Sequence, residues 1–87
     1  WEPLVRARAI ENGCYMLAVG QCGQKPTAHM YGHSMIVDPW GNVIANAADR
    51  PGVSIAEIDA AYLQKARNQL YTLQNRKESV YTLKKAY

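Results

Sequence analysis

The feature that most constrains the fold is a four-residue turn signal, Asp38-Pro39-Trp40-Gly41, placed between two short apolar runs. Asp in the first position, Pro in the second and Gly in the fourth match the preferences of a type I turn. The flanking runs, residues 33–38 and 42–47, have the length and composition of β-strands. The pattern therefore predicts a β-hairpin over residues 33–47.

Residues 1–12 are predicted to form a helix. Pro3 fits the first turn, where a missing N–H costs nothing. Apolar residues recur at helical spacing, at Leu4, Ala7 and Ile10. Gly13 then supplies the left-handed position that commonly ends a helix.

The segments between and after these elements predict two more strands and a second helix. Residues 14–20 are short and continuously apolar, which favours a strand buried on both faces. Residues 21–32 are rich in turn formers and indicate a loop, and residues 53–58 indicate a further strand. Asp59 is placed to cap a helix that runs to about Leu70. The predicted order is helix, strand, hairpin, strand, helix and tail, in a mixed α/β (α+β) arrangement.

The chain is long enough for one domain at most, because 87 residues fall below the usual domain size. Hydrophobic residues make up 48% and charged residues 20%, which argues against wholesale disorder. Charge is uneven: residues 62–87 carry six Lys or Arg against one acid, Glu78. Interspersed tyrosines make this tail a candidate for nucleic-acid binding. A solvated tail, or one docked on another subunit, is the preferred interpretation.

Four residues have the chemistry of metal ligands: Cys14, Cys22, His29 and His33. Structural zinc sites usually take cysteine pairs two to four residues apart, whereas seven residues separate these two. We therefore predict no metal site. Two cysteines are too few for a disulfide framework, which indicates free thiols in a reducing compartment, the cytoplasm.

Neither candidate nucleophile has an activating environment in the sequence. Cys14 follows a predicted helix C-terminus, where the helix dipole disfavours a thiolate. Ser34 and His33 are adjacent in a predicted strand, so their side chains should point to opposite faces. We expect Cys14 to be inert and Ser34 to hydrogen-bond local backbone groups.

Two stretches, RARAIENGCY at residues 6–15 and YGHSMIVDPWGNVIA at residues 31–45, resemble the C-terminal third of carbon–nitrogen hydrolases. These form the nitrilase superfamily, and the helix is most similar to its Nit-type and omega-amidase-like branches. The helix capped by Asp59, together with Arg67, residues 74–77 and Tyr81, is similar to the family's closing segment. The resemblance extends over residues 1–81.

The resemblance implies a partial α–β–β–α sandwich of the nitrilase type. It also implies a cofactor-free parent enzyme that hydrolyses nonpeptide C–N bonds in small amides, nitriles or carbamoyl compounds. In this chemistry a cysteine thiolate attacks carbon, a glutamate acts as base and a lysine stabilises the oxyanion, through a thioester intermediate.

The family's three catalytic residues all precede the region that this chain resembles. Its nucleophile lies in a Cys-Tyr/Trp-Asp/Glu motif, whereas Met16 follows Cys14-Tyr15 here. We therefore assign no catalytic, cofactor-binding or metal-binding residue. Trp1 and Glu2 would lie nearest the rest of the site. The chain is expected to be inactive alone, with residues 1–70 the C-terminal part of a hydrolase domain and 71–87 a basic tail.

The expected partners follow from the same resemblance. They are the N-terminal part of the same domain and a second subunit, in a homo-oligomer formed through the first helix, with Arg6 and Arg8, and the tail. A small amide substrate is expected only in the full-length parent, and neither a membrane nor a nucleic acid is expected as a partner. The alternative is a structural or oligomerisation piece that supplies strands and an interface.

Overall fold

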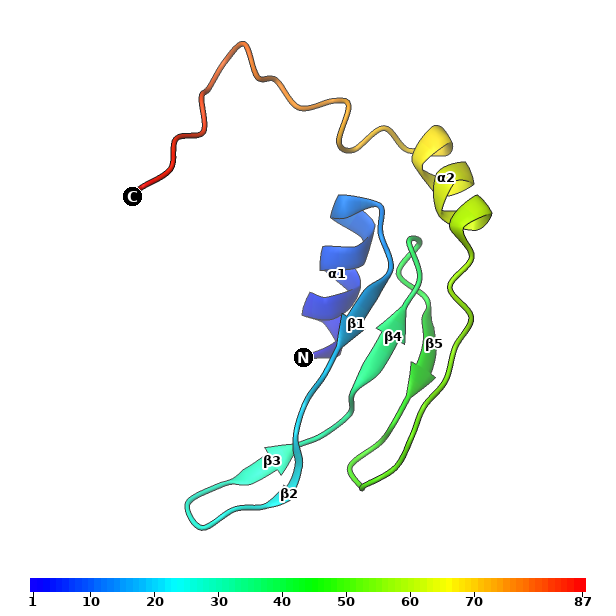
Figure 1. Cartoon of the computed structure of the whole chain (residues 1–87), viewed down its shortest axis with the longest axis vertical. Helices are drawn as coiled ribbons and strands as arrows, with labels where there is room; N and C mark the ends of the chain where they lie inside the picture. The colour runs from blue at the N-terminus through cyan, green and yellow to red at the C-terminus, as the bar shows by residue number, and fades with distance from the viewer.

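The computed structural model describes all of residues 1–87, which form two helices and two small sheets. The body is elongated, and the C-terminal tail runs away from it without forming a helix or strand (Figure 1). In chain order the elements are α1 (Glu2–Asn12), β1 (Met16–Ala18), β2 (Cys22–Gln24), β3 (His29–Tyr31), β4 (Met35–Val37), β5 (Val43–Asn46) and α2 (Ala60–Gln69). The mixed α/β class predicted from the sequence is confirmed.

The main sheet is antiparallel, with the strand order β1-β4-β5. Leu17 of β1 pairs with Ile36 of β4, which in turn pairs with Ala45 of β5. The register shifts between Ile36 and Val37, where β5 carries one extra residue as in a β-bulge. The predicted hairpin is therefore confirmed as β4–β5. Strand β1, which is distant in the sequence, pairs with the other edge of β4.

The turn of this hairpin is stabilised by the carboxylate of Asp38. Its Oδ1 accepts hydrogen bonds from the backbone N–H groups of Trp40 and Asn42, each at 2.9 Å. Its Oδ2 accepts from the Asn42 side-chain amide at 2.9 Å, and its carbonyl accepts from Gly41 N–H at 2.9 Å. Asp38 is buried, so these charge-assisted bonds replace the water that its carboxylate loses.

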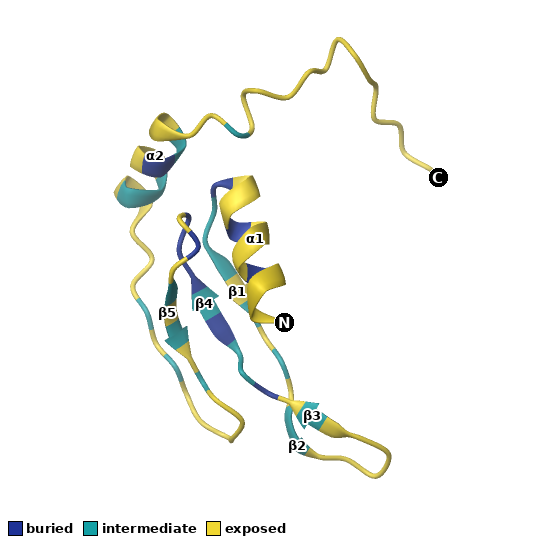
Figure 2. Ribbon diagram, turned by 180° about the vertical axis from the view of Figure 1, so that it is seen from behind, coloured by how far each residue is buried: buried dark blue, intermediate teal, exposed yellow.

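Helix α1 covers one face of the main sheet (Figure 2). Val5 and Ala9 of the helix form a buried cluster with Met35 and Val37 of β4. Gly13 ends the helix with φ of 54°, as predicted, because a residue without Cβ adopts this conformation at little cost.

Both arginines of α1 make contacts within the chain, and the expectation that they face a subunit interface stays a prediction. The Arg6 Nε–H donates to Gly41 O at 2.6 Å, which ties the helix to the hairpin turn. Arg8 pairs with Glu11 one turn further along the helix.

Two strand predictions and one loop prediction need correction. Residues 14–20 are not buried on both faces, because Leu17 is 60% and Val19 87% exposed on the side away from α1. The predicted loop over residues 21–32 contains the β2–β3 hairpin, whose three-residue strands are too short to show alternation. Residues 53–58 form no strand here, because no neighbouring strand hydrogen-bonds to them.

Helix α2 begins as predicted, with the Asp59 side chain accepting from the N–H groups of Ala61 at 2.9 Å and Tyr62 at 3.1 Å. The Arg67 Nε–H donates to Gly13 O at 2.8 Å, so α2 satisfies a carbonyl at the C-terminal end of α1. The Tyr15 hydroxyl accepts from Asp59 N–H at 3.2 Å and fixes the start of α2.

Replacement of Gly41 by Ala should destabilise the junction between α1 and the hairpin turn. Gly41 has φ of 82°, and a Cβ there would lie 2.6 Å from Ile10 Cδ1. We expect a loss of about 1–3 kcal/mol in the free energy of unfolding, measured from urea transitions followed by circular dichroism. Gly52→Ala is the matched control, because nothing lies within 4 Å of its Cβ position. Equal urea midpoints for the two variants would contradict this account.

Candidate functional site

The chain crosses itself where β1 leads into β2 and β3 leads into β4, and the residues with candidate chemistry gather there. The Ser34 hydroxyl accepts from Gly20 N–H at 2.9 Å and donates to Gly20 O at 3.1 Å. The crossing is close, since a Cβ on Gly20 would lie 2.7 Å from Gly32 O. Ser34 bonds backbone groups, as predicted, but they belong to Gly20, 14 positions away, and not to neighbouring residues. The Ser34 hydroxyl thus joins the two crossing strands in place of a regular ladder.

His33 occupies a strained position beside this crossing. Its φ is 56°, in the left-handed region that favours glycine, and its N–H donates to Ala48 O at 2.9 Å. The ring stacks on Tyr31 with centroids 4.2 Å apart, and Nδ1 lies 2.6 Å from Tyr31 O. Because a carbonyl only accepts, Nδ1 carries the proton and Nε2 of the neutral ring is left as an acceptor. Ser34 is not its partner, as predicted.

Trp1 completes the junction from the start of α1. Its indole N–H donates to His33 O at 3.0 Å. A cavity of about 230 Å³ lies between the indole and the β2–β3 hairpin, and it is lined by Trp1, Gly20, Gln21, Met30, Tyr31 and Gly32. We call the contacts of Trp1, Gly20, His33 and Ser34 the strand-crossing junction. The sequence offered no local signal for it, because its members are brought together from distant segments.

His29 pairs with Asp49, which lies in the turn after β5. The distance between His29 Nε2 and Asp49 Oδ2 is 2.9 Å, and both side chains are partly exposed. The hydrogen bond from His29 is the main cause that lowers the pKa of Asp49, and the nearby charge of His33 adds to it. This pair links the tip of the β2–β3 hairpin to the main sheet.

The two cysteines lie in separate places. Cys14 follows the end of α1 and donates its N–H to Ala9 O at 3.1 Å, while Cys22 opens β2 opposite Tyr31. Both are free and half-buried. No group of three or more His, Cys, Asp or Glu side chains lies close enough together to hold a metal ion.

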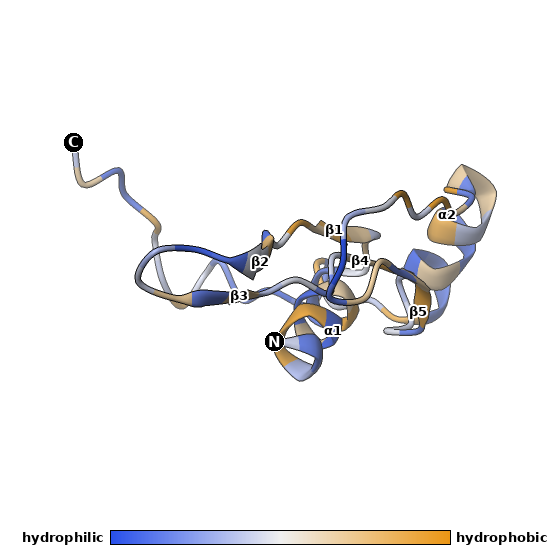
Figure 3. Ribbon diagram, turned by 90° about the horizontal axis from the view of Figure 1, so that it is seen from below, coloured by the Kyte–Doolittle hydropathy of each residue, from blue (hydrophilic) through white to orange (hydrophobic).

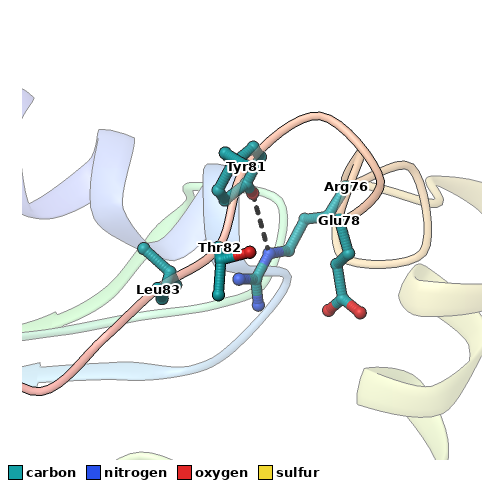
Figure 4. Close-up of a pocket in the computed structure, with 5 residues that line it drawn as sticks. All are labelled: Arg76, Glu78, Tyr81, Thr82 and Leu83. Carbon is teal, nitrogen blue, oxygen red and sulfur yellow. Dashed lines mark hydrogen bonds between the residues drawn. The ribbon is translucent and has the colours of Figure 1, made fainter.

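The basic tail forms a small loop of its own (Figure 4). The Arg76 Nε–H donates to the Tyr81 hydroxyl at 3.3 Å, and this bond raises the pKa of Arg76. A cavity of about 310 Å³ lies against these residues and Glu78, Thr82 and Leu83. Every group in it comes from the tail, so the cavity reflects local folding of the tail and has no contribution from the junction.

The pKa of Asp49 should rise toward its ordinary value when His29 is replaced by Asn. The hydrogen bond favours the carboxylate, so its contribution is present above the pKa of the unfolded chain and is lost as pH falls through the lower folded value. A carbon-detected NMR titration of the Asp49 carboxyl group measures this. His33→Asn is the control and should produce a smaller shift, because His33 acts through its charge alone. Equal shifts would contradict the assignment.

Neither helix is long and apolar enough to cross a membrane. Comparison with known proteins gives a more specific result. Residues 1–68 match the sequence profile of the family described as carbon-nitrogen hydrolase. The bovine protein named deaminated glutathione amidase is 50% identical over 82 residues, and the human protein of that name is 48% identical over the same length. Each match covers 93% of this chain and 25% of the relative, so the chain spans about a quarter of their length.

Solved structures give the same assignment. The Caenorhabditis elegans NitFhit protein superposes with a TM-score of 0.87 at 46% identity, over 94% of this chain and 20% of that one. A carbon–nitrogen hydrolase from Helicobacter pylori superposes with a TM-score of 0.84 at 28% identity, over 93% of this chain and 30% of that one. The fold is that of the nitrilase superfamily, and this chain belongs to the carbon–nitrogen hydrolase family.

Proposed function

We propose that this chain forms one part of a hydrolase that cleaves a nonpeptide C–N bond in a small amide. The main support is the 50% identity to the deaminated glutathione amidase of Bos taurus over nearly the whole chain. The backbone also superposes on the much longer NitFhit protein with a TM-score of 0.87. The chain therefore has the same fold as the matching segment of that larger protein. An amide related to deaminated glutathione is therefore the first substrate to test.

In this proposal the chain supplies structure and its relatives' remaining three quarters supply the chemistry. The cysteine, glutamate and lysine that the family resemblance implies have no matching positions here. The Trp1 side of the strand-crossing junction would lie next to that remainder, since α1 begins there. The chain alone should therefore bind and turn over no amide.

A structural or oligomerisation role is the second candidate, and one observation favours it. The face of the main sheet opposite α1 exposes Leu17 at 60% and Val19 at 87%, and the tail exposes Leu83 at 75%. Apolar surface of this kind marks a contact with another protein segment. A homo-oligomer formed through α1 and the basic tail, in the cytoplasm where both thiols stay reduced, remains part of this proposal.

An amidase assay separates these candidates. We expect no detectable turnover of short-chain monoamides or deaminated glutathione by the chain alone. Turnover is expected when the chain replaces the corresponding quarter of the bovine relative in one polypeptide, because the remainder then contributes the nucleophile. Turnover by the isolated chain that is lost in Cys14→Ala would contradict the proposal. Cys22→Ala, which removes the other free thiol, is the matched control.

A further inference from the structure

The end of α1 carries a dipeptide with a chemistry of its own, Asn12-Gly13. The main-chain nitrogen of the residue after an asparagine can attack the side-chain carbonyl carbon and form a five-membered succinimide ring. A glycine in that place favours the reaction, because it has no Cβ to obstruct the ring and its backbone is the most flexible. Asn12 is the only asparagine of the chain that precedes a glycine. The others precede Val43, Ala47, Gln69 and Arg76.

The structure holds the reacting groups of this dipeptide apart. Asn12 is the exposed last residue of α1, a helix in which hydrophilic residues separate the hydrophobic ones (Figure 3). Gly13 is buried, and its N–H donates to Ile10 O at 3.2 Å. The Asn12 Nδ2 donates back to Arg8 O at 2.8 Å. The side chain therefore points toward the start of the helix, away from the nitrogen that would attack it.

Contacts from α2 and the start of the tail stabilise this closed arrangement. The Arg67 Nε–H donates to Gly13 O at 2.8 Å. A Cβ on Gly13 would lie 3.5 Å from Arg67 Cγ and 3.8 Å from Thr72 Oγ1, so both side chains pack over the glycine. On the other side, the Cys14 N–H donates to Ala9 O at 3.1 Å. Helix ends open at a small cost in free energy, and each of these contacts raises that cost at the end of α1.

We propose that Asn12-Gly13 is a site of spontaneous deamidation, and that Arg67 sets its rate by holding the end of α1 closed. In the open state the Gly13 nitrogen bonds to Asn12 Cγ and the Cγ–Nδ2 bond breaks. The amino group leaves as ammonia, which takes the proton of the Gly13 N–H. Water then opens the ring at either of its carbonyl carbons. Attack at Cγ gives aspartate, and attack at the main-chain carbonyl gives isoaspartate, in which the chain runs through Cγ.

The product weakens the contact between the two helices. Isoaspartate adds a carbon atom to the main chain before Gly13, so the left-handed cap with φ of 54° and the Gly13 carbonyl no longer keep their places. Either product puts a carboxylate at the C-terminal end of α1, where the helix dipole disfavours negative charge. Both changes weaken the hydrogen bond from Arg67. The modification therefore keeps open a helix end that has once opened, and it does not depend on the proposed hydrolase function.

Mass spectrometry after timed incubation tests the site. Deamidation replaces an NH2 group by OH, and peptide mapping locates the gain in mass, while an isoaspartate methyltransferase with a labelled methyl donor detects isoaspartate. In the chain unfolded by guanidinium, we expect Asn12 to react faster than Asn75, which precedes an arginine. In the folded chain, Asn12 should react at least about tenfold more slowly than in the unfolded chain. Asn12→Gln should accept no methyl group at this position, because its longer side chain cannot form the five-membered ring.

Substitution in α2 tests the role of Arg67. Arg67→Ala should raise the deamidation rate of the folded chain by about 3- to 10-fold, because it removes a hydrogen bond from a charged donor. Lys65→Ala is the matched control, since Lys65 is an exposed cation of the same helix. Slow hydrogen exchange of the β4–β5 amides shows that each variant is folded. If Arg67→Ala loses this protection, Arg67→Lys takes its place, because lysine keeps the charge but has no N–H at the Nε position.

Each outcome decides one part of the proposal. Equal rates at Asn12 in the folded and unfolded chains overturn it, because the end of α1 then gives no protection. A rate at Asn12 no faster than at Asn75 in the unfolded chain overturns the site. Equal rates in Arg67→Ala and Lys65→Ala overturn the control by Arg67. The Arg67 Nε–H should exchange faster with water in the deamidated chain, measured by NMR, and unchanged exchange would contradict the weakened contact between the helices.

Discussion

The packing of α1 on one face of the β1-β4-β5 sheet is the contact on which the rest of the structure depends. Val5 and Ala9 bury the side chains of Met35 and Val37, and this cluster contains four of the few buried residues of the chain. Two polar contacts hold its geometry, because Asp38 orders the hairpin turn and Arg6 ties that turn to the helix. Without the turn, β4 and β5 would not be held side by side to form the face that α1 covers.

The opposite face of the same sheet carries exposed apolar side chains. Only 10 of 87 residues are buried, which is a thin core even for a chain of this size. Leu17 and Val19 are exposed on that face. Val53 and Ile55 are exposed on residues 53–58, which pair with no strand. The bovine and human relatives are about four times as long as this chain, and we propose that their further segments cover this face.

Local rules predicted the elements that local chemistry determines. The hairpin turn, the Gly13 helix end and the Asp59 cap depend on residues within a few positions of one another, and all three are confirmed. The β2–β3 hairpin escaped prediction, because three-residue strands carry too little periodicity. Residues 53–58 have the sequence pattern of a strand but form none. A strand must pair with a neighbouring strand, and the pattern alone does not show whether one is present.

The strand-crossing junction could not be predicted for a different reason. Its contacts join Trp1 to His33 across 32 positions and Ser34 to Gly20 across 14. The Asp49 carboxylate likewise meets His29 across 20 positions. The sequence predicted only that the Ser34 hydroxyl bonds backbone groups; it did not predict that these belong to the distant Gly20.

The central claim is that other protein segments cover the second face of the main sheet. Sedimentation velocity of the isolated chain over a dilution series tests this most directly. The account predicts association or aggregation that decreases on dilution, because the exposed apolar face and unpaired strand edges find partners in other molecules. A compact monomer at every concentration would contradict it.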